Sequence, residues 1–336
     1  MKKVSVIVPC YNEEATIRLL LEALYRQTYP LEDLEVVIAD GMSSDHTRQK
    51  IADFLNEHPR LHLRVVDNPL RVIPSGLNRA IEAAEGDYLV RLDAHSIPAA
   101  DYIERCAVAL DNGVGDNVGG IWRIQPAGDD WIARSIAVAA AHPLGAGDAL
   151  YRLGAKAQYV DTVPFGAFRR DLALQIGLFD ESLLTNEDYE FNIRIRNQGG
   201  RIWLDPAIQS TYFARSNLRS LARQYWRYGY WKAQMLRRYP NTIRWRQAVP
   251  PLFSASIICL FAIGFFYSFA WILLAFELAL YISVLLFAGI STALIQKSPG
   301  YVIGLPLAIA TMHIAWGTAL IWGIIRPSAT PSTVKK

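Results

Sequence analysis

The sequence predicts an α/β domain on a mostly parallel sheet, followed by a C-terminal helical region that enters a membrane. Short β-branched runs alternate with amphipathic helical segments over the first ninety residues, a pattern typical of a parallel sheet covered on both faces. Acidic residues are absent between Asp205 and Glu277, while arginines gather there. A nearly uncharged apolar run, Val249 to Ile295, follows, and Tyr301 to Ile325 is a further apolar stretch.

The elements of the α/β part follow from periodicity and from turn residues. Strands are expected at Val4–Val8, Leu34–Ala39, Leu63–Val66 and Tyr88–Leu92. Helices are expected at Glu14–Arg26, from a cap at Ser44 or Asp45 to about Leu55, and at Ser75–Glu85. Further along, the pattern predicts a helix over Tyr189–Gln198, ended by Gly199-Gly200, and a strand that begins at Arg201.

The apolar runs set the expected membrane region. A bilayer core needs roughly 20 apolar residues per helix, so the first run fits two spans and the second fits a third. The chain is then divided into a catalytic domain over 1–214, a basic amphipathic interfacial helix over 215–246, about three spans over 247–326 and a disordered tail over 327–336. Glu277 and His313 are the ionisable residues of the spans, and either Glu277 is protonated or the two hydrogen-bond.

Charge distribution and cysteine usage indicate the compartment. The formal net charge is only +3, and basic residues concentrate beside the first span, which favours anionic membrane lipids and not nucleic acid as partners. By the positive-inside rule, the catalytic domain is expected in the cytoplasm, on a multi-pass protein of the inner membrane. The three cysteines are far apart, with neither a disulfide framework nor a zinc spacing, as expected in a reducing cytosol. The first fourteen residues are too short and polar for a secretory signal.

Three strands deliver acidic residues to one edge of the sheet, where ligands of such sheets bind. The segments are Pro9-Cys10-Tyr11-Asn12-Glu13-Glu14, Asp40-Gly41-Met42-Ser43-Ser44-Asp45 and Arg91-Leu92-Asp93-Ala94-His95. Clustered carboxylates are unfavourable unless a cation or hydrogen-bond donors compensate them. Solvated turns at strand ends are the plain structural alternative.

Asp93-Ala94-His95 is the most specific of these segments. In an extended segment alternate side chains point the same way, so Asp93 and His95 can share a divalent metal. The mixture of carboxylate and imidazole ligands suits Mn²⁺ better than a pure oxygen site does. Alternatively, the histidine caps the next turn.

These three segments resemble the nucleotide-sugar-binding half of a family 2 glycosyltransferase with the GT-A fold, of the bacterial succinoglycan and exopolysaccharide type. Asp93-Ala94-His95 stands where the family has Asp-x-Asp, and Ala39 replaces the first Asp of its second motif. The resemblance implies that Asp93 and His95 hold Mn²⁺ or Mg²⁺ on the donor diphosphate. The donor-binding residues it implies are Pro9, Tyr11, Glu13, Asp40, Arg71, Asn78, Asp93 and Arg227. For Arg71, an ordinary surface arginine is the equal alternative.

Two later motifs complete the resemblance. The family's general base maps onto Asp188, with Glu187 orienting the loop, although carboxylates in a helix's first turn also favour the helix dipole. Gln224-Tyr225-Trp226-Arg227-Tyr228 resembles the family's Gln-x-x-Arg-Trp, with Tyr228 in place of Trp. Arg227 would then face the leaving diphosphate, and Gln224, Trp226 and Tyr228 the acceptor. Lipid anchoring by arginines and aromatics is the alternative.

The resemblance implies an inverting transfer of sugar from a nucleotide-sugar donor, expected to be a UDP-sugar, to a lipid-linked saccharide in extracellular polysaccharide or glycan synthesis. Three spans are too few to enclose a polymer channel in one chain, so we expect the addition of a single sugar. A polyprenyl-phosphate sugar synthase is the second reading. A non-catalytic nucleotide-sugar-binding scaffold is the third. A homo-oligomer or a polysaccharide assembly complex is compatible with each of them.

Overall fold

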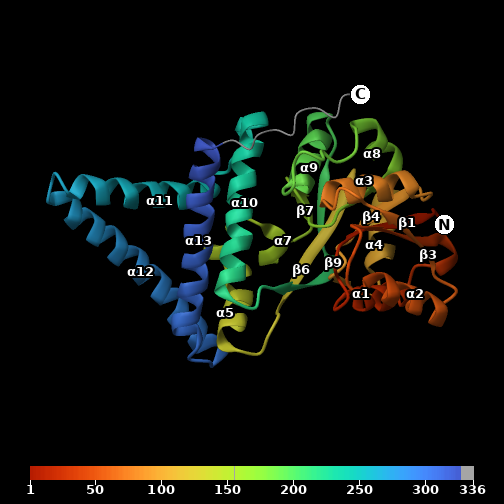
Figure 1. Cartoon of the computed structure of the whole chain (residues 1–336), viewed down its shortest axis with the longest axis horizontal. Coiled ribbons are helices and arrows are strands. Elements are labelled where there is room, and N and C mark those ends of the chain that lie inside the picture. Colours follow the sequence, from red (N-terminus) through yellow and green to blue (C-terminus); the bar gives the residue numbers. More distant parts are fainter. Residues whose placement is uncertain (155, 327–336) are drawn as a thin grey trace. The chain divides into compact units, whose positions relative to one another are not determined.

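The structure is a computed structural model that describes residues 1–154 and 156–326, and it contains two compact units (Figure 1). The first unit holds Met1–Arg123 and Leu150–Tyr212. The second holds Ile124–Ala149 and the chain from Phe213 onward. The predicted tail, 327–336, lies outside the described residues.

The first unit is built on a mixed sheet whose parallel half matches the predicted alternation. Its strands run in the order β3, β2, β1, β4. The strands are β1 (Val4–Cys10), β2 (Leu34–Asp40), β3 (His62–Asp67) and β4 (Tyr88–Arg91). The helices between them are α1 (Ile17–Tyr25), α2 (Thr47–Glu57) and α3 (Ile73–Ala83), after the short turn η1 (Leu31–Asp33).

Antiparallel strands continue the sheet beyond β4. The order proceeds through β8, β6, β9 and β5, and β7 pairs with β9. These strands are β5 (Ile97–Pro98), β6 (Asn117–Pro126), β7 (Gln158–Val160), β8 (Ala167–Arg169) and β9 (Ile202–Ala214). The accompanying helices are α4 (Tyr102–Asp111), α7 (Leu150–Leu153), α8 (Arg170–Ile176) and α9 (Glu187–Asn197).

The central strands are buried on both faces, which explains why they are continuous apolar runs rather than alternating ones. Val6 pairs with Val36 and Val90, and all three belong to the core cluster that includes α1, α2 and α4. The next residue, Ile7, pairs with Val37 and packs in the opposite cluster with α3, α8 and α9. Successive side chains of a strand point to opposite faces, so one strand serves two cores.

Helix starts differ from the sequence expectation by a few residues. The α1 helix begins at Ile17 because residues 13–16 form a turn in which Ile17 N–H donates to the Glu13 carbonyl. At α2, neither expected cap is the N-cap residue, which is His46; Asp45 lies one residue earlier, and its carboxylate accepts from Thr47 N–H at 3.0 Å. The α9 helix begins two residues before the predicted Tyr189, at Glu187.

The second unit is helical. It contains α5 (Trp131–Ala140), α6 (Pro143–Ala146), α10 (Leu218–Arg238), η2 (Pro240–Thr242), α11 (Trp245–Gly264), α12 (Phe269–Gln296) and α13 (Tyr301–Ile325). Of these, α11, α12 and α13 are long and apolar enough to cross a membrane. Figure 1 shows α10 beside α13, with α11 and α12 forming a hairpin that projects away from them.

Of the two alternatives for Glu277, the hydrogen bond to His313 is wrong. Glu277 accepts from the Ser256 hydroxyl at 2.5 Å, which ties α12 to α11. His313 instead contacts the Tyr281 hydroxyl at 3.0 Å. Its other ring nitrogen lies 2.7 Å from the Leu144 carbonyl. Each side chain meets a nearer polar group on another element, and a spacing pattern along the sequence does not reveal such groups.

Candidate active site

The loops that follow β1 and β2 are joined by hydrogen bonds. Asn12 N–H donates to the Ser43 hydroxyl at 2.8 Å, and Ser44 N–H donates to the Asn12 side chain at 2.9 Å. Glu13 N–H donates to the Thr47 hydroxyl at 2.8 Å. Asn12 adopts a left-handed backbone (φ 54°), a conformation that asparagine tolerates and that tight functional loops often use. Two of the predicted donor-binding segments are therefore held as one structure.

Asp40 lies at the carboxyl end of β2, fully buried, and pairs in register with Asp67 on β3. Arg48 of α2 bridges the two carboxylates at 2.5 Å each. Beside them the ring of Tyr11 is 44% exposed, and a Cβ added to Gly41 would lie 3.0 Å from it. The structure therefore brings Tyr11 and Asp40 to one edge, with a glycine that leaves the aromatic ring room.

His95 is paired with Glu13. The ring nitrogen Nδ1 lies 3.0 Å from the Glu13 carboxylate. Burial would raise the pKa of Glu13, but the hydrogen bond and the charge of His95, together with the hydrogen bond from Thr16, outweigh burial, and the pKa is lowered. The expectation of an extended Asp93-Ala94-His95 segment is wrong, because Ser96 N–H donates to the Asp93 carbonyl at 2.9 Å and closes a turn.

Arg91, the last residue of β4, is a buried cation among carboxylates. Its guanidinium donates to Glu187 at 2.8 Å and lies 3.5 Å from Asp93. Burial opposes the charge, yet Glu187, Asp93 and Asp188 together outweigh it and raise the pKa of Arg91. One buried guanidinium thus links the strand that carries Asp93 to the helix that carries Glu187 and Asp188.

The start of α9 presents the two acidic residues differently. Asn186 has a left-handed backbone (φ 68°) and turns the chain into the helix. Burial raises the pKa of Glu187 even though Arg91 opposes the shift, and the charge of Asp188 adds to the rise. Asp188 itself is only half-buried, and its carboxylate accepts from Tyr189 N–H at 2.7 Å. Glu187 therefore faces inward to Arg91, whereas Asp188 keeps contact with solvent.

Several polar atoms in this cluster are buried without a hydrogen-bond partner in the described part of the chain. They are Asp93 Oδ1 and Arg91 Nε and Nη1. Native proteins rarely leave such groups unsatisfied, and the exceptions mark ligand, ion or water positions. Asp93 Oδ1 is also the atom that lies 3.5 Å from the Arg91 guanidinium, so it has a charge partner but no hydrogen bond, and a carboxylate oxygen of this kind can accept a divalent cation. Within residues 1–154 and 156–326 there is no group of three or more His, Cys, Asp or Glu ligands, so Asp93 and His95 alone do not enclose one.

The remaining donor residues of the first unit lie along the same parallel half. Pro9 is on β1, next to Gly76 of α3. Arg71 is exposed in the loop before α3, with a left-handed backbone (φ 57°). Asn78 differs from expectation, because its amide group donates to the Phe179 carbonyl and to Glu181, both at 2.9 Å. Both amide hydrogens are used, so Asn78 holds the segment before α9 rather than offering a donor to a nucleotide.

The residues of the Gln-x-x-Arg-Tyr motif lie on α10 of the second unit. Gln224 donates to the Tyr228 hydroxyl at 2.9 Å, one helical turn away. Trp226 is 43% exposed and Arg227 is exposed. Their contact with donor or acceptor stays a prediction.

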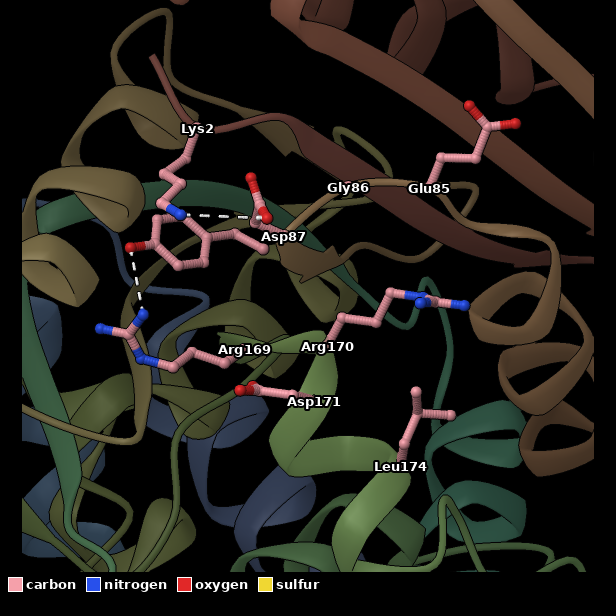
Figure 2. Close-up of a pocket in the computed structure, with 9 residues that line it drawn as sticks. Lys2, Glu85, Gly86, Asp87, Arg169, Arg170, Asp171 and Leu174 are labelled. Atoms are coloured by element: carbon pink, nitrogen blue, oxygen red, sulfur yellow. Dashed lines mark hydrogen bonds and ion pairs between the residues drawn. The ribbon is translucent and has the colours of Figure 1, made fainter.

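A pocket of about 270 Å³ lies at the other end of the parallel strands, beside the start of β4 and α8 (Figure 2). Within its lining, Lys2 lies 4.0 Å from Asp87 and Arg169 lies 3.4 Å from the Tyr88 hydroxyl. It faces the amino ends of β1 and β4, whereas Asp40 and Asp93 follow carboxyl ends. The carboxyl edge is therefore the candidate active site.

Sequence reasoning missed Arg91 and Arg48 as members of the site. Arg91 carried a readable signal, because it is a charged residue inside the apolar run Tyr88–Leu92, where an ionisable group must be paired when buried. Arg48 carried none, since an arginine on a polar helix face is usually solvated.

The fold is that of GT-A glycosyltransferases. The structure matches the mannosyltransferase PcManGT from Pyrobaculum calidifontis, solved with GDP-Man and Mn²⁺, with a TM-score of 0.63 and 21% identity over 96% of this chain and 87% of that one. It also matches Staphylococcus aureus TarS 1–349 in complex with UDP, with a TM-score of 0.51 and 17% identity over 95% of this chain and 90% of that one.

The chain belongs to glycosyl transferase family 2, whose model matches residues 5–177. It is 32% identical to the succinoglycan biosynthesis protein ExoA of Rhizobium meliloti, over 93% of this chain and 92% of that protein. It is 26% identical, over 98% and 99% of the two chains, to a Methanococcus voltae glucuronosyltransferase named for a dolichyl N-acetylglucosaminyl phosphate. The predicted family and glycosyltransferase activity are thereby confirmed.

Proposed function

We propose that this glycosyltransferase moves one sugar, with inversion at the anomeric carbon, from a UDP-sugar to a lipid-linked saccharide. The observation that carries the proposal is the Arg91 cluster, in which one buried guanidinium bonds Glu187 at 2.8 Å and lies 3.5 Å from Asp93. This contact joins the strand end suited to a diphosphate with the helix that bears the half-buried Asp188.

Asp188 is the general base in this proposal. It takes the proton of the acceptor hydroxyl as that oxygen attacks the anomeric carbon. The new bond from oxygen to carbon forms while the bond from that carbon to the diphosphate breaks, and the nucleoside diphosphate leaves with the electron pair. Glu187 is a positioning residue and not a second base, because its carboxylate is buried and bonded to Arg91.

The donor lies along the carboxyl ends of β1, β2 and β4. Tyr11 binds the base and ribose, the buried Asp40 positions Arg48 at the same edge, and Glu13 holds His95 through its bond to Nδ1. A divalent cation, held by Asp93 and His95, would supply Lewis-acid stabilisation to the departing diphosphate. Support comes from the unsatisfied Asp93 oxygen and from the Mn²⁺ in the PcManGT complex.

The similar proteins support the substrate classes of the proposal. TarS was solved with UDP and with UDP-GlcNAc, whereas PcManGT was solved with GDP-Man. The name of the Methanococcus relative describes a dolichyl-phosphate-linked acceptor, and ExoA is named for succinoglycan biosynthesis. The lipid-linked acceptor in the name of the Methanococcus relative agrees with an enzyme that carries long apolar helices.

The test is nucleotide release from a panel of UDP- and GDP-sugars with membrane lipid acceptor and Mn²⁺, for wild type and Asp188→Asn. We expect the variant to lose roughly 10²–10⁴-fold in turnover, the usual contribution of a general base, while nucleotide affinity is unchanged. Asp171→Asn is the matched control, because Asp171 also begins a helix and its carboxylate accepts from the next N–H at 2.7 Å. Equal turnover by wild type and Asp188→Asn would exclude Asp188 as the base.

The same assay separates the other two readings. A polyprenyl-phosphate sugar synthase would use bare polyprenyl phosphate and leave a lipid-linked saccharide unmodified. A scaffold would bind UDP with every donor unconsumed, in wild type and variant alike. Release of GDP rather than UDP would correct the donor and leave the transferase chemistry intact.

A further inference from the structure

The α13 helix is covered by protein far more than the other two long apolar helices. In its most apolar window 44% of residues are buried, compared with 11% in α11 and 22% in α12. Its neighbours are α5, α6, α10, α11 and α12, and Figure 1 shows α10 running beside it. Protein therefore surrounds α13 on several sides. The charge and the length of the neighbouring helices decide whether α13 can cross the hydrocarbon core.

One neighbour, α10, is strongly basic. The two helices approach closely, since a Cβ added to Gly229 would lie 2.4 Å from the Trp316 carbonyl oxygen. Near the other end of the contact, Gln234 donates to the Gly323 carbonyl at 3.1 Å. The charged residues of α10 are Arg219, Arg223, Arg227, Lys232, Arg237 and Arg238. If α13 crossed the hydrocarbon, α10 would have to cross beside it and carry these charges into the bilayer core, where charged residues are strongly disfavoured.

A second neighbour, α5, is too short to cross. It packs on the first half of α13, where a Cβ added to Gly304 would lie 2.2 Å from the Ser135 hydroxyl. The helix has 10 residues and starts at Trp131, after the N-cap Asp130, whose carboxylate accepts from Ile132 N–H. Irregular chain therefore flanks α5 at both ends. Lipid-exposed irregular backbone does not occur within a hydrocarbon core.

Both legs of the α11–α12 hairpin rest on α13. Near the start of α11, the Gln247 carbonyl accepts from the Trp316 side chain at 3.3 Å. Near the end of α12, a Cβ added to Gly289 would lie 2.8 Å from the Val302 carbonyl oxygen. The entry and exit of a two-span hairpin lie on the same side of a bilayer. A helix that bridges them, as Figure 1 shows for α13, lies on that side too.

We propose that only the α11–α12 hairpin enters the hydrocarbon, and that α13 lies with α5 and α10 at the membrane surface. With 20 residues α11 is about 30 Å long and with 28 residues α12 is about 42 Å, enough for one upright and one tilted span. The partner of the hairpin is lipid hydrocarbon, and the partner of the α10 arginines is anionic headgroups. The chain then crosses twice, and Arg326 is on the same side as Met1.

Depth measurement on the full chain in vesicles of phosphatidylglycerol and phosphatidylethanolamine tests this arrangement. Spin labels are placed on α13 at Ile303→Cys, Ile314→Cys and Ile325→Cys, which are 59%, 49% and 68% exposed. A spacing of eleven residues keeps them on one face of the helix. We expect equal, shallow depths, read from collisions with oxygen and with a nickel chelate. A deepest label at Ile314→Cys, with shallow labels on either side, overturns the proposal.

A second series on α12 calibrates the measurement. Leu273→Cys, Leu280→Cys and Phe287→Cys are 42%, 57% and 76% exposed and are spaced by seven, again on one face. All variants carry Cys259→Ser, because Cys259 is the exposed native cysteine among the three. We expect a depth gradient along this series with Leu280→Cys deeper than any α13 label. Water-accessible labels throughout α12 would overturn the proposal by showing that the hairpin does not insert.

Sidedness gives an independent outcome. In sealed vesicles, an impermeant maleimide should modify Arg326→Cys from the same side as Lys50→Cys in the first unit. It should modify Tyr267→Cys, at the exposed tip of the hairpin, from the opposite side only. Modification of Arg326→Cys from the side opposite Lys50→Cys establishes a third span and overturns the proposal. Neither measurement depends on turnover, so failure here is distinct from failure of the proposed reaction.

Discussion

At the scale of single residues, the site depends on one charge that the chain cannot leave unpaired. Arg91 is buried between Glu187 and Asp93, and removing one partner of a buried ion pair leaves the other charge uncompensated. The same residue explains why Glu187 and Asp188, adjacent in sequence, differ in chemistry. Glu187 is fixed by the guanidinium, while Asp188 is the acidic group with access to solvent.

Replacing Arg91 by leucine should therefore destabilise the protein by about 3–5 kcal/mol. Arg91→Lys should lose less stability, because it keeps the charge, but should still raise the KM for the donor through lost geometry. Thermal denaturation of the full chain in detergent measures the first effect. The exposed Arg79→Leu is the matched control, with no change expected. A wild-type melting temperature for Arg91→Leu would contradict the central position assigned to Arg91.

At the scale of elements, strands and helices are joined by side chains distant in sequence. Glu35 of β2 accepts from Glu85 N–H at 2.5 Å and from Arg64 of β3 at 2.9 Å, and it also bonds Ser5 of β1. Burial would raise the pKa of Glu35, but these donors together outweigh burial and lower it. The amino ends of three parallel strands therefore share one ionised carboxylate.

The lowered pKa of Glu35 predicts that the folded protein loses stability at acidic pH. Its folded pKa lies below the ordinary value of 4.5, so its stabilisation is present above pH 4.5 and is lost as pH falls through the folded pKa. Melting temperature should fall on acidification from pH 5.5 in wild type. Glu35→Gln should melt lower at pH 6 and show a shallower fall. Identical pH profiles for the two proteins would show that Glu35 is not the linked group.

Close helix packing in the second unit depends on glycine. A Cβ at Gly229 would lie 2.4 Å from the Trp316 carbonyl oxygen, so Gly229→Ala must push α10 away from α13. Overpacking of this kind should reduce stability by about 1–3 kcal/mol. Gly128→Ala, whose Cβ meets nothing nearer than 3.4 Å, is the control in the same unit. Equal melting temperatures for both variants would contradict the tight α10–α13 contact.

At the scale of the whole molecule, the chain assembles each unit from separated segments. The segment Ile124–Ala149, which follows β6, belongs to the helical unit and returns to the sheet unit at Leu150. The apolar surface of the helical unit is uneven, because α11 and α12 are open while α13 is covered. Exposed apolar surface indicates which helices contact lipid. Helix length and composition alone do not separate α13 from α11 and α12.

A single arginine placed at equally exposed positions on α12 and α13 should show which of the two helices lies in the hydrocarbon core. Leu280→Arg on α12 and Ile314→Arg on α13 replace residues that are 57% and 49% exposed. An arginine at the centre of a span costs about 2.5–3.5 kcal/mol on insertion scales. Leu280→Arg should shift protein out of the carbonate-resistant membrane fraction, and Ile314→Arg should remain there. Equal loss in both variants would indicate that α13 is as deep as α12.

The sequence by itself determined the α/β alternation, the acidic strand ends and the apolar helices, because periodicity and charge are local properties of a chain. It also determined the family, through motifs at the ends of β1, β2 and β4 and at the start of α9. Only the tertiary structure decided that His95 pairs with Glu13, that Arg91 joins Asp93 to Glu187, that Asn78 is tied to Phe179 and Glu181, and that α10 and α5 cover α13. Each of these is a contact between residues that are distant in sequence, and residue spacing along the chain does not predict such contacts.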